Sequence, residues 1–350
     1  MLLHQRTIFQ LVDSRTIGGI ESHILNLTRW LVSHGYRTEI VFLRGYGNPH
    51  PLQEKLASTH IKSRTLNGTT ALIQLLTKHD CLLATHGYKA GLIGRLVGKL
   101  CRTPVVSTYH NGDLGSGKLR FYTWLDAFTS VLASGTICVS PEIKHRLPAQ
   151  SLLLPNFVKG NHLPTPPGQQ IAFVGRLSEE KGPDQFALLT RQFAKEADLQ
   201  VYGDGPLRKE LEMSEPHLHF NGNVTMEMHW HKIGLLCITS RCEGLPLVAL
   251  EAMARGIPVV SFSLGALPKL IAHGQNGWLI DPDDNASFKQ AIHTWLTLSE
   301  QQRHAMGAAA RARINREYSS DVVCPRIVDL YYQSLHPQSD FRISPDKGHL

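Results

Sequence analysis

Short apolar runs that alternate with helix-like segments are the feature that most restricts how this chain can fold. In the first half, the strand-like runs are TIFQLV, TEIVFL, DCLLATH, PVVSTYH and TICVS. Between the first two lies ESHILNLTRWLVSHG, where Ile24, Leu27 and Leu31 recur at helical spacing and Gly35 ends the helix. Strands and helices that alternate in this way predict a parallel, doubly wound sheet.

A second series of the same kind begins after a proline-rich segment. This segment, residues 154–170, contains Pro155, Pro164, Pro166 and Pro167 and is typical of an interdomain connection. The strand-like runs that follow are IAFVGR, LQVYGDG, HLHFNG, LLCITS, PVVSF and GWLI. The predicted fold is therefore α/β, with two Rossmann-like, doubly wound domains that face each other across a cleft.

These patterns predict four parts along the chain. We expect residues 1–158 to form the first Rossmann-like domain and residues 159–320 the second. Residues 321–335 are expected to form a helix that returns to the first domain, and the polar, proline-containing residues 336–350 a flexible tail. At 350 residues the chain is long enough for two domains, each with its own core.

Composition and charge exclude several classes of protein. With 42% hydrophobic and 19% charged residues, the chain is an ordinary globular protein, neither disordered nor collagen-like. The net charge of +7 favours phosphorylated ligands or an anionic membrane surface. No basic stripe with interleaved aromatic residues occurs, which argues against nucleic acid as a partner. The six cysteines form no CxxC motif and are typical of thiols in a reducing compartment.

The compartment is also predicted from what the chain lacks. The amino-terminal apolar stretch is too short for a signal peptide, and no run reaches the ~18 apolar residues of a membrane-spanning helix. We therefore expect a cytoplasmic protein, with peripheral contact to the inner face of the membrane left open.

Two glutamates in the run TSRCEGLPLVALEAMARGIPVV are the strongest candidates for ligand contact. Glu243 follows a strand-like run, and Glu251 lies on the following helix, about two turns in if that helix starts near Leu245. Parallel α/β sheets bind ligands at the carboxyl ends of their strands, and carboxylates accept hydrogen bonds from sugar hydroxyls. The alternative is a solvated Glu243 and a Glu251 on the outer surface of its helix.

Basic residues and glycines at other strand ends are candidates for binding phosphate. In FVGRLSEEKG, Gly175 turns the chain, and Arg176 and Lys181 could neutralise a diphosphate. Their alternative partners are Glu179 and Glu180. Gly18 and Gly19 precede a helix whose N-terminus could receive a phosphate, although such a pair more often marks a turn.

One histidine is a candidate for acid–base chemistry or substrate contact. His110 follows a strand in the first half and is expected to face the acids of the second half. The segment VYGDGP, by contrast, is expected to be a structural turn that lines the cleft.

Four other patterns resemble known sites but favour simpler interpretations. Residues 112–119 match a P-loop except that Leu119 replaces the Ser or Thr that binds the metal ion. In residues 281–284, Asp283 or Asp284 is expected to cap a helix rather than hold a divalent ion. The pairs His217/His219 and His229/His231 are two residues apart, and 229–231 is expected to be helical, so we predict no metal cluster there. No GxSxG nucleophile motif occurs.

Taken in order, the motifs resemble the retaining glycosyltransferases of the GT-B fold, specifically glycosyltransferase family 4. The matching runs are GGIE (18–21), FVGRLSEEKG (173–182), VYGDGP (201–206), SRCEGLPLVALEAMARGIPVV (240–260) and GALPKLIAHGQNGWLIDPDD (265–284). The resemblance spans nearly the whole chain and is densest in its second half. It implies a nucleotide-sugar donor in the second domain and a saccharide or lipid-linked acceptor in the first.

The resemblance also implies roles for single residues. Arg176 and Lys181 would hold the donor diphosphate with help from the backbone at Gly19, and Glu251 would hold the ribose. Glu243 would contact the donor sugar, and His110 would lie near the anomeric carbon. It also assigns donor contacts to Gly175, Gly244, Leu247 and Val248. No metal or other cofactor is implied, because basic residues and helix N-termini would stabilise the leaving group.

The predicted activity is transfer of a sugar with retention of configuration, in bacterial surface-polysaccharide biosynthesis. The chain departs from the family at Ala266 and Lys269, where glycine and an acid are common, so the resemblance assigns no donor contact to these two residues. Two alternatives stay open: a nucleotide-sugar epimerase of the same fold, and a catalytically silent protein that binds sugar nucleotides.

Overall fold

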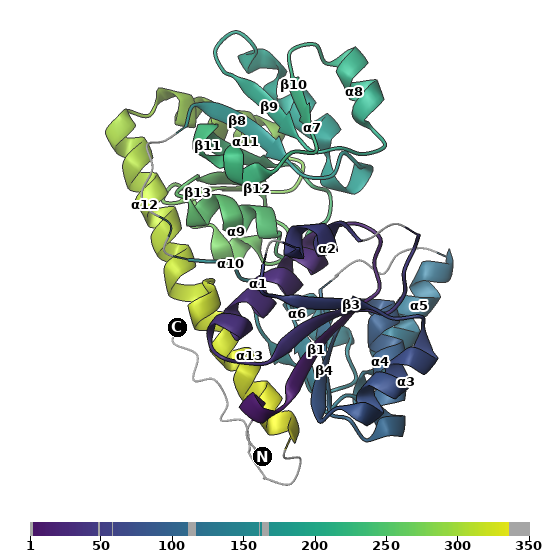
Figure 1. Ribbon diagram of the computed structural model, residues 1–350. Helices are drawn as coiled ribbons and strands as arrows, with labels where there is room; N and C mark the ends of the chain where they lie inside the picture. The colour runs from purple at the N-terminus through teal and green to yellow at the C-terminus, as the bar shows by residue number, and fades with distance from the viewer. Residues whose placement is uncertain are drawn as a thin grey trace.

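The computed structural model describes residues 3–47, 50–57, 59–110, 117–160, 162 and 168–335. These residues form two lobes, one built from the first half of the chain and one from the second (Figure 1). Each lobe has a central parallel sheet with helices on both faces, which confirms the predicted α/β fold with two doubly wound domains.

The first lobe contains a seven-stranded sheet of order β3-β2-β1-β4-β5-β6-β7. Its strands are β1 (Thr7–Val12), β2 (Thr38–Phe42), β3 (Lys62–Thr65), β4 (Cys81–His86), β5 (Val105–Tyr109), β6 (Gly135–Cys138) and β7 (Leu152–Leu153). Its α-helices are α1 (Gly19–Ser33), α2 (Pro51–Leu56), α3 (Thr69–Lys78), α4 (Tyr88–Cys101), α5 (Gly117–Phe128) and α6 (Pro141–Arg146). Short 3-10 turns cover Leu3–Gln5 and Thr129–Leu132, and the second, η2, directly continues α5.

The second lobe contains a six-stranded parallel sheet of order β10-β9-β8-β11-β12-β13. Its strands are β8 (Gln170–Val174), β9 (Leu199–Tyr202), β10 (His219–Gly222), β11 (Ile233–Ile238), β12 (Val259–Phe262) and β13 (Gly277–Ile280). Its α-helices are α7 (Pro183–Thr190), α8 (Arg208–Ser214), α9 (Leu247–Ala254), α10 (Leu267–Leu270), α11 (Asn285–Thr297) and α12 (Glu300–Glu317). Its 3-10 turns cover Glu179–Lys181, Arg191–Phe193, Met226–Met228 and Trp230–Lys232.

Each sheet has a point where the strand order reverses. In the first lobe β1 lies between β2 and β4, and in the second lobe β8 lies between β9 and β11. Because chains leave the sheet in opposite directions on either side of such a point, a crevice opens at the carboxyl ends of the two strands. The loops after β1, β4, β8 and β11 are therefore where a ligand site is expected.

The last helix, α13 (Ser320–Leu335), packs against the first lobe although it follows α12 of the second. Cys324, Ile327 and Tyr331 are buried in the core beside α1 and the first sheet, and the Trp30 indole donates a hydrogen bond of 2.9 Å to Asp321. Figure 1 shows α12 and α13 as one path down the side of the molecule. The carboxyl-terminal helix thus ties the two lobes together.

The chain passes between the lobes twice, and the two crossings are paired. Val158 N donates to Tyr318 O at 3.1 Å, and Ser320 N donates to Val158 O at 2.8 Å. The connection therefore consists of two hydrogen-bonded segments, one from 158 and one from 318–320.

Some local features differ from the sequence-based expectations, and one helix cap agrees with them. Strand β3 carries only polar residues, so no apolar run predicts it, and β7 is only two residues long. His229 lies between two 3-10 turns and His231 lies in the second of them, so the segment is not the α-helix that was expected. Asp284 caps α11 by accepting a 3.0 Å hydrogen bond from Ser287 N, as predicted. The P-loop-like residues 112–116 lie outside the described part of the chain.

Candidate functional site

The loops that follow β8 and β11 are bound to each other closely enough to require glycine. Gly182 has φ +64°, and a Cβ there would lie 2.1 Å from Thr239 O. The Thr239 hydroxyl donates to Gly182 O at 2.7 Å, which closes the contact from the other side. The two loops that contain Lys181 and Glu243 therefore move as one unit.

Lys181 and Glu243 form an ion pair at the carboxyl ends of these strands. Lys181 Nζ lies 2.7 Å from Glu243 Oε1, and the Ser240 hydroxyl donates to the same oxygen at 2.6 Å. The Glu243 side chain is 7% exposed and that of Lys181 35% exposed. Glu179 and Glu180, the alternative partners of Lys181, are not the ones that it contacts: Glu180 instead accepts a 2.7 Å bond from Ser178.

Arg241 holds the same two loops from the outside. Its backbone N donates to Glu180 O at 2.9 Å, and its guanidinium donates to Glu179 O at 2.6 Å. The guanidinium also pairs with Asp184 at 2.5 Å. Arg241 and Asp184 are positioning residues that sequence reasoning missed, because their role depends on a contact across the sheet.

Arg176 lies on the exposed part of the loop after β8, next to the close contact between the β8 and β9 loops. Gly203 has φ +136°, and a Cβ there would lie 1.8 Å from Gly175 O. Leu177 N donates to Asp204 O at 2.9 Å. The VYGDGP turn thus supports the backbone of the loop that carries Arg176, in agreement with its expected structural role.

Glu251 lies on α9, one turn from the helix start at Leu247 rather than about two turns as expected. Burial raises its pKa to about 7, although Arg255 and Lys55 lower it in part. Lys55 belongs to α2 of the first lobe, so Glu251 faces the boundary between the lobes. A carboxyl group with this pKa is poised to gain charge when a ligand supplies hydrogen-bond donors.

Gly244 brings the second lobe up to His110 of the first. A Cβ on Gly244 would lie 3.9 Å from His110 O, and Asn156 Nδ2 donates to Leu245 O at 2.8 Å. Below this contact, Gly265 has φ +53°, and its Cβ would lie 2.2 Å from Glu243 O. Leu247 is buried and Val248 is partly buried at the start of α9, so both support this loop from beneath.

The N-terminus of α1 faces the same region from the first lobe. Gly18 N donates to the Glu21 carboxylate at 2.7 Å, which positions the first turn. A Cβ on Gly19 would meet no atom within 4 Å. Helix α1 therefore presents backbone N–H groups and open space beside Gly19, where an anionic group can approach.

His110 belongs to a cluster of three histidines. His86 Nδ1 and His110 Nε2 lie 3.1 Å apart, and His86 Nε2 lies 2.7 Å from Gln10 Oε1. Because the Gln10 carbonyl only accepts, His86 carries its proton on Nε2, and His110 Nε2 donates to His86 Nδ1. His110 is then left with an unprotonated Nδ1. Burial first, and then His23 and His86, hold the pKa of His110 well below its usual value, so its ring is neutral.

The third member, His23 on α1, was missed by sequence reasoning. It is buried against His110 and Phe157, and burial lowers its pKa to about 4. An interaction with the Asn156 side chain raises that pKa in part. One nitrogen each of His23, His86 and His110 lies within 4.8 Å of the others, which makes this the group of described residues able to hold a metal ion.

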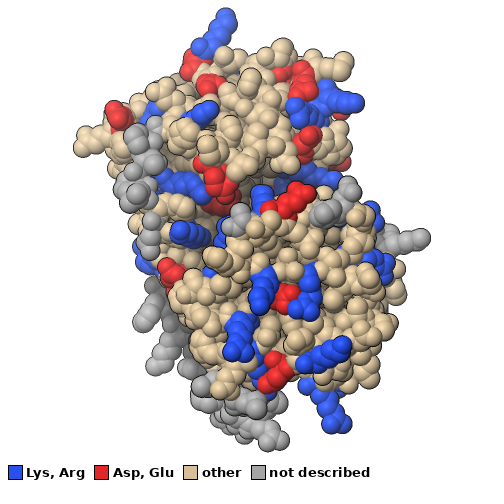
Figure 2. Space-filling view, in the orientation of Figure 1, with Lys and Arg blue, Asp and Glu red and all other residues tan. Residues whose placement is uncertain are grey.

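The candidate site is therefore an interdomain groove with both signs of charge (Figure 2). The structure brings Lys181, Glu243 and Gly244 together on the second lobe, opposite His110. Such a groove can bind a molecule that carries an anionic group and several hydroxyls.

Comparison with known proteins shows the family. Two family profiles match in succession, "Glycosyltransferase Family 4" over residues 17–151 and "Glycosyl transferases group 1" over residues 168–297. The chain belongs to glycosyltransferase family 4. Among the helices of the described residues, none has the length and hydrophobicity of a membrane-spanning segment.

Two glycosyltransferases with similar sequences are distant relatives of this chain. A 2-deoxystreptamine N-acetyl-D-glucosaminyltransferase of Niallia circulans is 23% identical and aligns with 90% of this chain and 97% of its own. An Escherichia coli UDP-Gal:alpha-D-GlcNAc-diphosphoundecaprenol alpha-1,3-galactosyltransferase is 24% identical over 65% of this chain and 70% of its own.

A solved structure shares the two-lobed fold. Anabaena HepE in complex with UDP and glucose superposes with a TM-score of 0.81 at 18% identity, over 93% of this chain and 99% of that one. At this identity the likeness establishes the GT-B fold of this family-4 glycosyltransferase.

Proposed function

We propose that the protein transfers a sugar from a nucleotide diphosphate sugar to a saccharide or lipid-linked acceptor, with retention of configuration. The observation that carries the proposal is the Lys181–Glu243 ion pair, which lies at the carboxyl ends of β8 and β11 and faces His110 through Gly244. The nucleotide-sugar ligands of the HepE structures and the names of the bacterial relatives support this substrate class and a role in surface-polysaccharide biosynthesis.

The ion pair suggests how a donor binds. The diphosphate would take Lys181 as its counter-ion, with Arg176 and the N-terminus of α1 beside Gly19, and Glu243 would then accept hydrogen bonds from the sugar. Both charges keep a partner during the exchange, so neither is left uncompensated in a partly buried site. Glu251 would accept hydrogen bonds from the ribose hydroxyls.

The proposed catalysis depends on stabilising the charge that develops on the leaving group. As the glycosidic bond breaks, negative charge collects on the leaving diphosphate, and preorganised cations next to it lower the barrier. Closure of the two lobes would exclude water that competes with the acceptor hydroxyl. For the stereochemistry we propose front-face attack, in which the acceptor enters on the side from which the diphosphate leaves. The anomeric configuration of the product, read by NMR, tests this step.

We also propose that no divalent cation takes part, because Lys181 and Arg176 supply the positive charge that a metal ion would otherwise bring to the diphosphate. The proposed location is the cytoplasm, in contact with the inner face of the membrane when the acceptor is lipid-linked. Both proposals can be tested separately from the activity itself.

The test compares two variants with a matched pair in the same lobe. Lys181→Met should weaken UDP binding roughly tenfold or more, because a charged hydrogen-bond donor to phosphate is lost. It should leave uridine binding unchanged. Glu243→Gln should keep UDP binding and lower turnover of the UDP-sugar roughly hundredfold. Arg191→Met and Glu215→Gln, which remove an exposed ion pair of 2.7 Å, should do neither.

The result also separates the alternatives. Isomerised donor in the absence of acceptor would indicate an epimerase, and nucleotide-sugar binding without turnover would indicate a silent binding protein. Thermal shifts with a panel of nucleotide diphosphates and their sugars identify the donor before either assay. If Lys181→Met binds UDP as tightly as the wild type does, the proposed diphosphate site is wrong.

A further inference from the structure

Helix α5 and the turn η2 that continues it carry large apolar side chains on the outside of the protein. Phe121, Trp124, Phe128 and Val131 are 58%, 58%, 59% and 59% exposed, and we call these four residues the α5 face. The ring centroids of Phe121 and Trp124 are 6.2 Å apart, and those of Trp124 and Phe128 are 5.6 Å apart. The spacing of three and four residues places the rings along one side of the helix.

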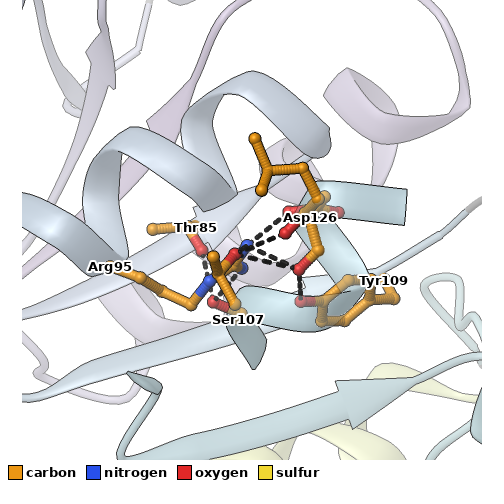
Figure 3. Close-up of polar contacts among 7 residues, drawn as sticks. Thr85, Arg95, Ser107, Tyr109 and Asp126 are labelled. Atoms are coloured by element: carbon orange, nitrogen blue, oxygen red, sulfur yellow. Dashed lines mark hydrogen bonds and ion pairs between the residues drawn. The ribbon is translucent and has the colours of Figure 1, made fainter. Parts of the chain in front are cut away.

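The inner side of the same helix is polar. Asp126 is buried and pairs with Arg95 of α4 at 2.5 Å, and Arg95 itself is fully buried (Figure 3). The guanidinium also donates to Ser107 and Thr129, and the Tyr109 hydroxyl donates to Asp126 O at 2.9 Å. These bonds fix how α5 is rotated about its axis, so its aromatic side cannot turn inward without breaking a buried ion pair.

The orientation of α5 is thus the reverse of a helix that folds for stability alone. A surface helix normally buries its apolar side and exposes its charges. Here the helix buries an aspartate and exposes a row of aromatic rings. Exposed apolar patches of this kind mark places where a protein meets an apolar partner.

The charges around the α5 face indicate which partner. From residue 88 to residue 135 the chain contains Lys89, Arg95, Lys99, Arg102, Lys118 and Arg120. The acidic residues of this stretch are Asp126 and Asp113. Asp126 is buried and paired with Arg95, and Asp113 lies outside the described residues. Lys99, Arg102 and Arg120 are exposed. Within the described part of 88–135, the exposed charges are therefore all positive.

We propose that the α5 face docks onto an anionic lipid bilayer. Tryptophan, tyrosine and phenylalanine rings enter the interface between headgroups and acyl chains, and lysine and arginine bind the anionic headgroups. A protein partner or a second copy of this chain would need an acidic surface around an apolar groove, which no described residue of this face offers to its own copy. The inference does not depend on the proposed transfer reaction.

Docking would also set the direction of the catalytic groove. Strand β5 ends at Tyr109, His110 follows it, and α5 begins at Gly117. The face and the groove therefore lie at the two ends of one short connection. A bilayer bound to α5 would lie beside the side of the groove that contains His110, within reach of an acceptor anchored in lipid.

Vesicle sedimentation tests the proposal with the full chain. We expect the wild type to sediment with vesicles of phosphatidylglycerol and phosphatidylcholine, and to bind at least tenfold more weakly to phosphatidylcholine alone or at high salt. The variant Phe121→Ser/Trp124→Ser/Phe128→Ser should lose at least tenfold in binding. The control Leu188→Ser/Met213→Ser/Met228→Ser removes exposed apolar side chains from the second lobe and should bind like the wild type.

Two further measurements keep the outcome clear. Lys99→Glu/Arg120→Glu should weaken binding to anionic vesicles without changing the α5 rings. Trp124→Phe should still bind, but the quenching of tryptophan fluorescence by brominated lipid should fall. A far-UV circular dichroism spectrum and a cooperative thermal unfolding transition like those of the wild type show that each variant is folded. Equal sedimentation of the triple variant, no sedimentation of the wild type, or a dimer that the triple substitution dissociates would each overturn the proposal.

Discussion

Glu251 is expected to make the protein less stable as pH rises, and replacement by glutamine should remove this effect. Its pKa rises from 4.5 to about 7 on folding, mainly because the carboxylate loses solvent. Between these values the folded state binds more protons at this site than the unfolded state does. The free energy of unfolding therefore decreases as pH rises from 4.5 through 7 and is lower by a constant amount above that.

The size of the effect follows from the shift. A shift of roughly 2.5 pKa units corresponds to about 3 kcal/mol at about 1.4 kcal/mol per unit. This is an upper value, because Arg255 and neighbouring water relax around the charge. Glu251→Gln keeps the shape of the side chain and carries no charge at any pH. The melting temperature of Glu251→Gln should therefore exceed that of the wild type by more at pH 8 than at pH 5. The increase in this difference should be several degrees, at roughly 2–4 °C per kcal/mol.

The assay is scanning calorimetry of both proteins at pH 5 and pH 8, with Glu210→Gln on the exposed side of α8 as the control. The same change should weaken UDP binding, because glutamine offers the ribose one acceptor oxygen in place of two. In the wild type, UDP binding should fall roughly tenfold from pH 8 to pH 6, as the carboxylate is protonated. If the difference in melting temperature between Glu251→Gln and the wild type is the same at both pH values, the reasoning is refuted.

Three further predictions concern the backbone, the histidines and the metal. Gly203→Ala should lower the free energy of unfolding by about 2 kcal/mol or more, because its Cβ would collide with Gly175 O, and denaturant titration measures this. Activity should survive EDTA, since the proposed catalysis needs no divalent cation; a loss restored by Mg²⁺ would contradict it. Zinc at micromolar concentration should inhibit, because neutral His23, His86 and His110 are suited to bind it, and His23→Asn should relieve the inhibition.

The alternation of strands and helices was sufficient to predict both sheets, because each buried parallel strand is a short apolar run. Strands β3 and β7, at the two edges of the first sheet, were not predicted, because β3 is polar and β7 is only two residues long. Lys181 and Glu243 could each be chosen as strand-end residues, whereas their pairing depends on the order of β8 and β11 in the sheet. That order cannot be read from local patterns.

The missed histidines differ in how much signal the sequence held. His86 ends a strand-like run, DCLLATH, by the same criterion that selected His110, so it could have been found. His23 lies inside a helix, and only the packing of α1 brings it to the other two. The outward orientation of Phe121, Trp124 and Phe128 is still less visible, because rings at this spacing usually face a core. The Arg95–Asp126 ion pair turns the rings outward instead. Its two residues are 31 positions apart in the sequence, so no local pattern reveals the pair.

The paired crossings at Val158 and Tyr318–Ser320 restrict how the lobes can move. Two strands of backbone bonded side by side bend easily across their width but resist rotation about their length. We therefore expect the lobes to move by hinge rotation about this connection rather than by sliding past each other. Such a hinge keeps Gly244 on the side of the groove opposite His110. Proteolytic cleavage of only one of the two crossings would leave the lobes covalently joined. Its main effect would be to permit rotation of one lobe relative to the other about the remaining segment.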